Sequence, residues 1–492
     1  MKCSFVVPGY KCDEYIFRNI DSILDQDYTN YEIIVVLNGK WETKNDIVSK
    51  LLEKYFDKIQ VFSIDRGHLG YANNYGIERC TGDVVSCLSS DLYLMPGTLR
   101  TWIDTFKENP DCDFVYSGYK LVSDDPLDVY RSNGFNRYHL ECENYIDGAN
   151  PVRRNAVARW DEKLTSLIDW DYFLSVTRNG IKGYFIKEPI YYAELPKEGG
   201  LSQDSSANWV RIRREIQEKH GIPDRKICVT SLIDPAYAIE LAQMAGADFR
   251  VYPGHKPHDY RLIYMYGFFC DVQDRNIQRS TGVFARHYGH KIIQWVGQDV
   301  MSLIQLRWYD VDLYSSMVLK KINHHFCYSQ NELNILNKIG LTSEIFYPPI
   351  PLNGVVEKKR AISVNEPELM VQLSKSMPDQ DFFLNDLSCD ITVHYQDRPD
   401  KIFRSILNGN HVITNSYYPN VYHVQGFTNV PELRKMVCHT IRGIQKKGEK
   451  PSDEAINFYM PRTRPDAFRK KLERVANKHI QKLGKLEDIA HA

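Results

Sequence analysis

One carboxylate in this sequence stands where chemistry is expected. Asp91 follows an apolar run at residues 84–88 and precedes the turn Pro96-Gly97, after which a helix is predicted from Thr98. A short run that is apolar on both faces is typical of a central parallel strand, and ligands bind outside the carboxyl ends of such strands in open α/β sheets. A carboxylate at that point can hold a hard divalent cation against a diphosphate. From this stretch alone, a turn cap explains Asp91 equally well.

The elements that must position Asp91 are predicted strands alternating with helices. Strands are predicted at residues 4–7, 31–37, 59–64 and 84–88, and helices from about Glu14 and over residues 45–55. Each strand ends in turn-forming or polar residues. This alternation predicts an α/β fold with a parallel, doubly wound sheet and right-handed crossovers.

The four strand ends together carry a family resemblance. They read, in order, Val6-Val7-Pro8-Gly9-Tyr10, then Glu32-Ile33-Ile34-Val35-Val36-Leu37-Asn38-Gly39, then Gly70-Tyr71-Ala72-Asn73-Asn74-Tyr75-Gly76, and finally Leu88-Ser89-Ser90-Asp91 with Pro96-Gly97. This series resembles the nucleotide-sugar domain of family-2 glycosyltransferases with a GT-A fold, and most closely their rhamnosyltransferase-like subgroup. The resemblance covers about residues 1–205.

The resemblance implies a set of site residues. It implies transfer of a sugar from a nucleoside-diphosphate donor with inversion, Asp91 as the ligand of Mg²⁺ or Mn²⁺, and Asp169 as the catalytic base. The donor-binding positions that it implies are Pro8, Tyr10, Asn38, Arg66, Gly70, Asn73, Asn74, Ser89, Ser90 and Asp91.

The chemistry of Asp169 fits this role, because an attacking hydroxyl must lose a proton and a carboxylate within roughly 2.6–3.2 Å can take it. The alternative is that Asp169 or Asp171 caps the helix that starts near Trp170. Trp170 itself is expected in the core, with stacking on an acceptor sugar as the alternative.

The sequence also departs from the family pattern. Leu37 stands where an acid is usual, Ser89 occupies the first position of the metal motif, and Ile168 replaces a Glu. Ala193-Glu194-Leu195 stands where the family commonly carries an Arg and a His, so that Glu194 is a weak substitute. A metal site with one carboxylate depends on substrate phosphates to complete its shell.

A second α/β region follows a basic helix at residues 209–220. Residues 221–350 and 351–450 read as two Rossmann-like halves joined by a proline-rich segment, and residues 451–492 read as helices that pack back. At the level of the fold this region resembles a GT-B glycosyltransferase domain. Its candidate cleft residues are Trp295, Gly297, Asp299, Arg398, Lys401 and Arg404. A solvated helix face explains the basic residues as well, and a helix cap explains Asp299 as well.

Composition narrows the classes of function. The net charge of −1 disfavours bulk electrostatic binding of nucleic acid. The 11 scattered cysteines suit reduced thiols in the cytoplasm. Neither a signal peptide nor an apolar run long enough to span a membrane is apparent. The predicted partners are a nucleotide sugar and a glycan acceptor.

Two alternatives stay open at this point. The first is sugar transfer to a hydroxylated base in nucleic acid, for which the basic stretches at residues 210–214 and 358–360 could follow phosphates. The second is a non-catalytic carbohydrate-binding or scaffold protein built on degenerate transferase folds. The oligomeric state, the donor sugar and the linkage are not fixed by the sequence.

Overall fold

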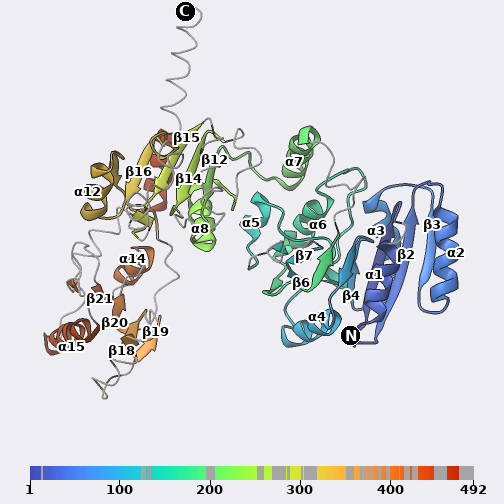
Figure 1. Cartoon of the computed structure of the whole chain (residues 1–492), viewed down its shortest axis with the longest axis horizontal. Helices are drawn as coiled ribbons and strands as arrows, with labels where there is room; N and C mark the ends of the chain where they lie inside the picture. Colours follow the sequence, from blue (N-terminus) through green and yellow to red (C-terminus); the bar gives the residue numbers. More distant parts are fainter. Residues whose placement is uncertain are drawn as a thin grey trace, which may run out of the picture. The chain divides into compact units, whose positions relative to one another are not determined.

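The structure is a computed structural model that divides into two compact units, Met1–Asp224 and Arg225–Ala492. It describes all residues except 13–14, 123–128, 131, 133, 195–205, 252–259, 269–283, 285–286, 288, 298, 301–302, 304–317, 351–358, 366–368, 371–372, 374–376, 378–379, 381, 386–388, 395–398, 409, 415–421, 424–429, 448–462 and 476–492. Figure 1 shows both units.

The first unit is built on a seven-stranded sheet with the order β10-β6-β9-β4-β1-β2-β3. Its strands are β1 (Cys3–Gly9), β2 (Tyr31–Asn38), β3 (Gln60–Ile64), β4 (Val84–Cys87), β6 (Phe114–Ser117), β9 (Val152–Arg153) and β10 (Gly183–Ile186). The neighbours β3, β2, β1 and β4 pair in parallel, whereas β9 runs antiparallel to both β4 and β6. The carboxyl ends of the first four strands therefore meet at one edge.

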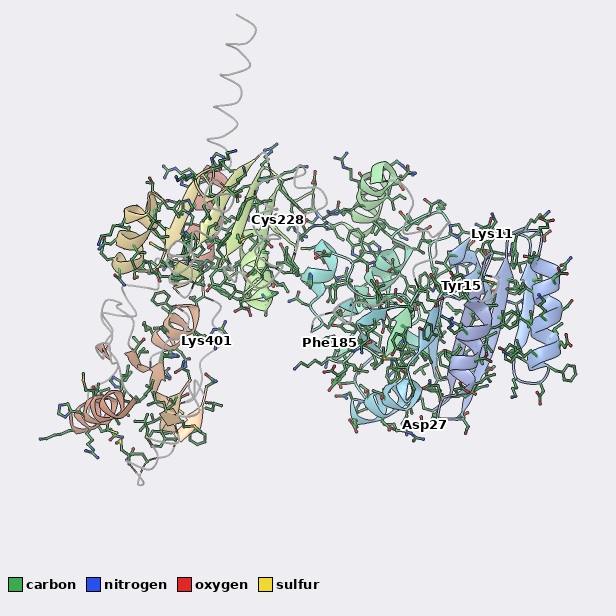
Figure 2. All side chains as sticks on the ribbon, viewed as in Figure 1. Lys11, Tyr15, Asp27, Phe185, Cys228 and Lys401 are labelled. Carbon is green, nitrogen blue, oxygen red and sulfur yellow. The ribbon has the colours of Figure 1, made fainter. Side chains whose placement is uncertain are left out.

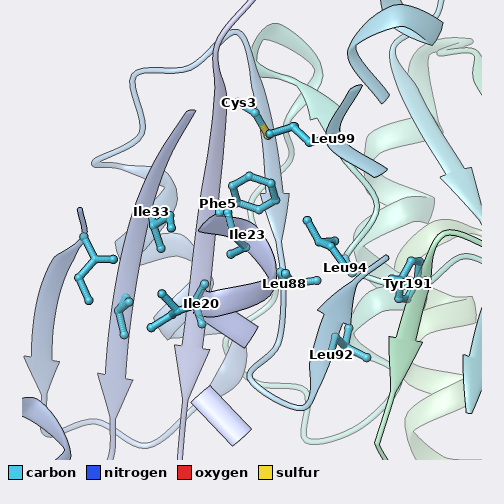
Figure 3. Packing of buried hydrophobic residues seen from close by; sticks show 14 of the residues in the cluster. Cys3, Phe5, Ile20, Ile23, Ile33, Leu88, Leu92, Leu94, Leu99 and Tyr191 are labelled. Atoms are coloured by element: carbon cyan, nitrogen blue, oxygen red, sulfur yellow. The ribbon is translucent and has the colours of Figure 1, made fainter. Parts of the chain in front are cut away.

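Helices cover both faces of this sheet (Figure 1). They are α1 (Tyr15–Leu24), α2 (Lys44–Tyr55), α3 (Leu69–Ile77), α4 (Thr98–Glu108), α5 (Arg137–Cys142), α6 (Ile168–Val176) and α7 (Ser206–His220), with the short 3₁₀ turns η1 (Arg154–Ala156) and η2 (Thr177–Asn179). Along β1, Phe5 and Val7 join one apolar core and Val6 joins the other, as strand periodicity requires. Figure 3 shows the first core, in which Phe5 packs near Ile23 and Leu94.

A small second sheet has the order β5-β11-β7-β8. Its strands are β5 (Leu92–Leu94), β11 (Tyr191–Ala193), β7 (Tyr119–Leu121) and β8 (Val129–Tyr130). Strand β5 begins directly after Asp91, and β7 begins two residues after the end of β6. The small sheet therefore holds the chain just beyond the carboxyl ends of β4 and β6.

The second unit contains two sheets in which every pairing is parallel. The first has the order β13-β12-β14-β15-β16-β17, and the second has the order β19-β18-β20-β21-β22. The strands are β12 (Ile227–Thr230), β13 (Asp248–Phe249), β14 (Leu262–Tyr266), β15 (His290–Gln294), β16 (His324–Cys327), β17 (Ser343–Ile345), β18 (Lys359–Val364), β19 (Phe382–Leu384), β20 (Cys389–His394), β21 (His411–Thr414) and β22 (Tyr422–His423). The helices are α8 (Pro235–Ala245), α12 (Gln330–Lys338), α14 (Pro399–Leu407) and α15 (Val430–Lys447).

The predicted α/β class is confirmed in both units. The GT-B-like assignment of the second unit stays a prediction. In the part of the chain that the structure describes, we find no helix with the length and apolar character to cross a bilayer. The ten described cysteines are all free and buried.

Candidate active site

The loops that follow β1, β2 and β3 meet at the carboxyl edge of the first sheet. Asn38 is buried and donates from Nδ2 to the carbonyl of Gly9 over 3.1 Å, which joins the ends of β2 and β1. The half-exposed ring of Tyr10 lies against Gly39, where an added Cβ would come within 2.8 Å of it. Gly39 also has a φ of +79°, a conformation that favours glycine. An exposed aromatic ring above a glycine backbone is a suitable surface for a nucleobase.

Lys44 also holds this edge of the sheet together. Its buried ammonium donates to the carbonyls of Gly39 and Ile64, at 2.7 Å each, and so ties the ends of β2 and β3 together. Pro8 is buried within β1. The predicted base-pocket residues Pro8, Tyr10 and Asn38 therefore lie at one edge, with only the Tyr10 side chain open to solvent.

The predicted ribose and diphosphate residues are used largely to hold a loop. The guanidinium of Arg66 pairs with Glu162 over 2.7 Å and stacks on the ring of Tyr71. Asn74 is buried, donates from Nδ2 to both the carbonyl of Trp160 and Glu162, and accepts from the Trp160 N–H. The amide of Asn74 is thus fully engaged within the protein, and any role toward a donor stays a prediction.

Gly70 and Asn73 lie beside this loop on α3. A Cβ on Gly70 would stand 2.7 Å from the carbonyl of Asp161, so close packing requires glycine there. Asn73 is 2% exposed, and its Oδ1 has no hydrogen-bond partner among the described residues. Both residues are buried, so that Arg66 is the member of this predicted set that reaches solvent.

Asp91 is held by a tight turn at the end of β4. The Leu92 N–H donates to the Ser89 carbonyl over 2.9 Å, and Asn19 Nδ2 donates to the carbonyls of Ser89 and Leu92. Ser89, Ser90 and Asp91 are half-buried. Burial raises the pKa of the Asp91 carboxyl, and its side chain has no hydrogen-bond or ion-pair partner on another described residue.

Asp169 lies in the first turn of α6. Its Oδ1 accepts from the Trp170 N–H over 3.0 Å, and its Oδ2 accepts from Asn144 Nδ2 over 2.9 Å. The residue is half-buried, and burial raises its pKa in spite of these two hydrogen bonds. The preceding residue but one, Leu167, has a φ of +53°, which is strained for a side chain of this kind. Leu167 is the N-cap of α6 and no side chain caps the helix, so Asp169 lies inside its first turn and its catalytic role stays a prediction.

Asp171, two residues further on, has a different environment. It is fully buried, and its oxygens lie 2.8 Å from Lys219 Nζ and 2.8 Å from His220 Nε2, at the end of α7. Lys219 also pairs with Asp161 over 2.7 Å. Asp171 is therefore an internal tie between helices. Trp170 is buried in the core and donates to the carbonyl of Leu140, so the sugar-stacking alternative for Trp170 is wrong.

Sequence reasoning missed a third carboxylate. Asp147 accepts at Oδ1 from the Ala149 N–H over 2.9 Å and is also hydrogen-bonded to Tyr191. Burial, followed by the charge of Asp169 and that of Asp91, raises the pKa of Asp147 to about 7. The same three carboxylates, after burial, raise the pKa of the Tyr119 hydroxyl. Electrostatic influence of this kind requires proximity, and the structure thus brings together Asp91, Asp147 and Asp169, which we call the three-aspartate site.

The sequence held only a weak signal for Asp147. It precedes the segment Gly148-Ala149-Asn150-Pro151, whose turn character was visible. The fold places Asp147 shortly before β9, and a strand of two residues is too short to show a periodic pattern in the sequence.

The oxygen donors at this site suit a hard divalent cation. No group of three or more His, Cys, Asp or Glu side chains arranged to hold a metal occurs among the described residues. Asp91 offers a half-buried carboxylate without a protein partner among them, which fits an ion that is shared with substrate phosphates. Glu194 adds little, because its carboxylate pairs with Arg18 while its N–H donates to the Asp91 carbonyl over 3.0 Å.

The candidate residues of the second unit separate into two groups. Trp295 is buried and donates to His325. Asp299 is buried and accepts from three backbone N–H groups, those of Phe268, Val296 and Val300, and its cleft role stays a prediction. Burial raises its pKa to about 6. Gly297 has a φ of +96° and approaches the carboxylate of Glu332.

The basic candidates lie around a cavity of about 330 Å³ in the second unit. Lys401 and Arg404 line it from α14, together with Asp234 and Glu240 from the region of α8. Arg404 lies 3.5 Å from Glu240, so its charge is partly matched. Figure 2 labels Lys401 on this helix. Arg398 lies outside the described residues.

The fold and the site of the first unit define a class: a doubly wound α/β domain with acidic side chains at the carboxyl edge of its sheet, the edge where such domains bind ligands. The sequence profile described as "Glycosyl transferase family 2" matches residues 4–158. Residues 4–158 therefore match glycosyltransferase family 2, the family that the strand ends resemble.

Individual relatives match parts of the chain. An uncharacterised glycosyltransferase of Rickettsia bellii is 29% identical over 247 residues, which cover 44% of this chain and 34% of that protein. A chondroitin synthase of Pasteurella multocida is 24% identical over 36% of this chain and 19% of that protein. The crystal structure of TarS from S. aureus aligns with 19% identity and a TM-score of 0.36, over 44% of this chain and 39% of that one. This chain thus spans about a third or less of the length of the two sequence relatives.

Proposed function

We propose that the first unit is a nucleotide-sugar-dependent glycosyltransferase that inverts the anomeric centre and acts on a glycan hydroxyl. The observation that carries the proposal is the convergence of Asp91 and Asp169. Both are half-buried, and both influence Asp147 and Tyr119 at one edge of the sheet. A nucleoside base above Gly39, next to Tyr10, would leave the diphosphate directed toward Asp91.

The protein side chains would act in a single displacement. The acceptor oxygen bonds to the anomeric carbon while the bond from that carbon to the diphosphate oxygen breaks, and its electron pair leaves with the diphosphate. Asp169 takes the acceptor proton. Asn144 and the Trp170 N–H hold the Asp169 carboxylate in one orientation for this step. A divalent ion bound through Asp91, Mg²⁺ or Mn²⁺, would supply neutralisation of the leaving diphosphate.

A polysaccharide or another glycan is the acceptor that we propose. The chondroitin synthase relative makes a glycan product by its name, and neither the family match nor that relative supports a nucleic-acid acceptor. For the second unit we propose two Rossmann-like halves of GT-B type, residues 221–350 and 351–450, that act as a second transferase or hold the acceptor. The cavity beside Arg404 is the place where a ligand of that unit would bind.

Donor turnover tests the proposal. The whole chain is incubated with Mn²⁺ and with UDP-glucose, UDP-GlcNAc or GDP-mannose in turn, and release of the nucleoside diphosphate is measured. We expect release from at least one donor, with a loss of about 10²–10⁴-fold in D169N. The control variant is D104N, because Asp104 lies on the surface of α4, where it pairs with Lys107. If the wild-type chain releases no diphosphate and no donor raises its melting temperature, the scaffold alternative replaces the enzyme.

A further inference from the structure

Asp147 lies on the loop between α5 and β9. Ser86 Oγ donates to the Ala149 carbonyl over 2.6 Å, which attaches this loop to β4. The Ser117 N–H donates to Asn150 Oδ1 over 3.1 Å, which attaches it to the end of β6. The loop is therefore fixed at the same edge as Asp91, on the side of β4 that faces away from β1, β2 and β3.

The carboxylate of Asp147 is also fixed in orientation. The Ala149 N–H and the Tyr191 hydroxyl both hold it, and Asn150 Nδ2 donates to its backbone carbonyl over 2.9 Å. A Cβ added to the next residue, Gly148, would stand 3.7 Å from Cβ of Asp169, so this loop contacts the first turn of α6 directly. The loop of Asp147 and the turn of Asp169 are thus neighbours, the charge of Asp169 acts on Asp147, and each carboxylate can accept several hydrogen bonds.

The surroundings of Asp147 favour a hydroxyl over a cation as its partner. The charged and titratable groups near it include Asp169 on α6, Asp91 after β4, Tyr191 on β11 and Tyr119 on β7. No Lys or Arg is paired with it among the described residues. A group bound to Asp147 would therefore lie beside Asp169.

We propose that Asp147 is a positioning residue for the acceptor: it accepts a hydrogen bond from a second hydroxyl of the sugar whose first hydroxyl is deprotonated by Asp169. The inference rests on the proposed function. It names the acceptor chemistry as a polyol with neighbouring hydroxyls, because one acceptor hydroxyl must reach each of the two carboxylates. During transfer the proton still goes to Asp169, and Asp147 keeps its hydrogen bond throughout.

A comparison of transfer to two small acceptors, in separate reactions, tests this inference. The whole chain, Mn²⁺ and the donor that it turns over are supplied with glycerol or with 1-propanol, and the two transfer rates are expressed as a ratio. Both reactions share the donor and Asp169, so the ratio cancels any general loss of activity. We expect the wild-type ratio to favour glycerol by about tenfold, the effect of one hydrogen bond to a charged group. The D147A ratio should fall to about one, and the D147N ratio should lie between the two.

Each other outcome has a definite meaning. A D147A or D147N ratio within twofold of wild type, or a wild-type chain without a preference for glycerol, overturns the inference. So does a rise of more than tenfold in the Mn²⁺ needed for half-maximal turnover at an unchanged ratio, because Asp147 would then serve the metal. D104N should keep the wild-type ratio. If D147A does not fold, D147N decides, since its amide can still accept from the Ala149 N–H. Failure of the wild type to use any donor refutes the proposed function itself and is recognised before any ratio is measured.

Discussion

Two aspartates in one helical turn should respond differently to the same substitution, one through activity and the other through stability. Asp169 and Asp171 both lie in the first turn of α6, but Asp169 reaches solvent whereas Asp171 is fully buried between Lys219 and His220. Replacement of either by asparagine preserves the shape of the side chain and removes its charge. We expect D169N to lose activity with little change in stability, and D171N to lose stability.

The magnitude for D171N follows from its contacts. Breaking a buried ion pair costs about 3–5 kcal/mol, because the remaining charge stays buried. The Lys219 side chain is 38% exposed and keeps its pair with Asp161, so the lower end applies, about 3 kcal/mol. One kcal/mol shifts the melting temperature of a domain of this size by about 2–4 °C, which gives a fall of about 6–12 °C.

Calorimetry of the whole chain, with hydrogen exchange of peptides from α6 and α7, measures this effect. The exchange data assign the transition to the first unit. E215Q is the matched control on α7, because Glu215 pairs with Arg211 on the surface and should contribute less than about 1 kcal/mol. For D169N we expect turnover to fall by about 10²–10⁴-fold at an unchanged or higher melting temperature, since burial already disfavours its charge. The reasoning is refuted if D171N melts within about 2 °C of wild type, or if D169N loses as much stability as D171N.

Three further outcomes are expected. D91N should raise the Mn²⁺ concentration for half-maximal turnover by at least tenfold, as a metal titration would show, because Asp91 is the carboxylate that the proposed function assigns to this ion. Burial raises the pKa of Glu332 to about 7 from an ordinary value of 4.5, so its contribution to folding is complete below about pH 4.5 and is lost as the pH rises through 7. The second unit should therefore lose up to about 3 kcal/mol between pH 5 and 8, and E332Q should flatten this dependence in melting curves. G76A should destabilise the first unit by about 1–3 kcal/mol in denaturant unfolding, because its Cβ would stand 2.3 Å from a methyl group of Val6.

The main elements of the fold could be predicted from the sequence because their burial is periodic or continuous. The strand predicted at residues 31–37 is β2 (Tyr31–Asn38), and the strand predicted at residues 84–88 is β4 (Val84–Cys87). Strands of two or three residues, such as β9 and β5, leave no period to detect. The antiparallel position of β9 and the whole small sheet were therefore missed.

The candidate site was predictable where a residue type follows a strand end. Asp91 was found in this way, whereas Asp169 followed from the family resemblance, and the catalytic roles of both stay predictions. The sequence could not separate Asp169 from Asp171, because the partner of Asp171 is Lys219, 48 positions further along the chain. Asp147 was missed for a similar reason: its neighbours Asp169 and Asp91 are distant in sequence and meet it only in the folded sheet.

The buried cysteine thiols can report the unfolding of each unit separately. Burial raises the pKa of Cys3, Cys80 and Cys327 well above that of a free thiol, so these groups stay unreactive while their cores are closed. Six of the ten described cysteines lie in the first unit and four in the second. Alkylation followed by mass spectrometry would then show at what point each unit opens, without an added dye or tag.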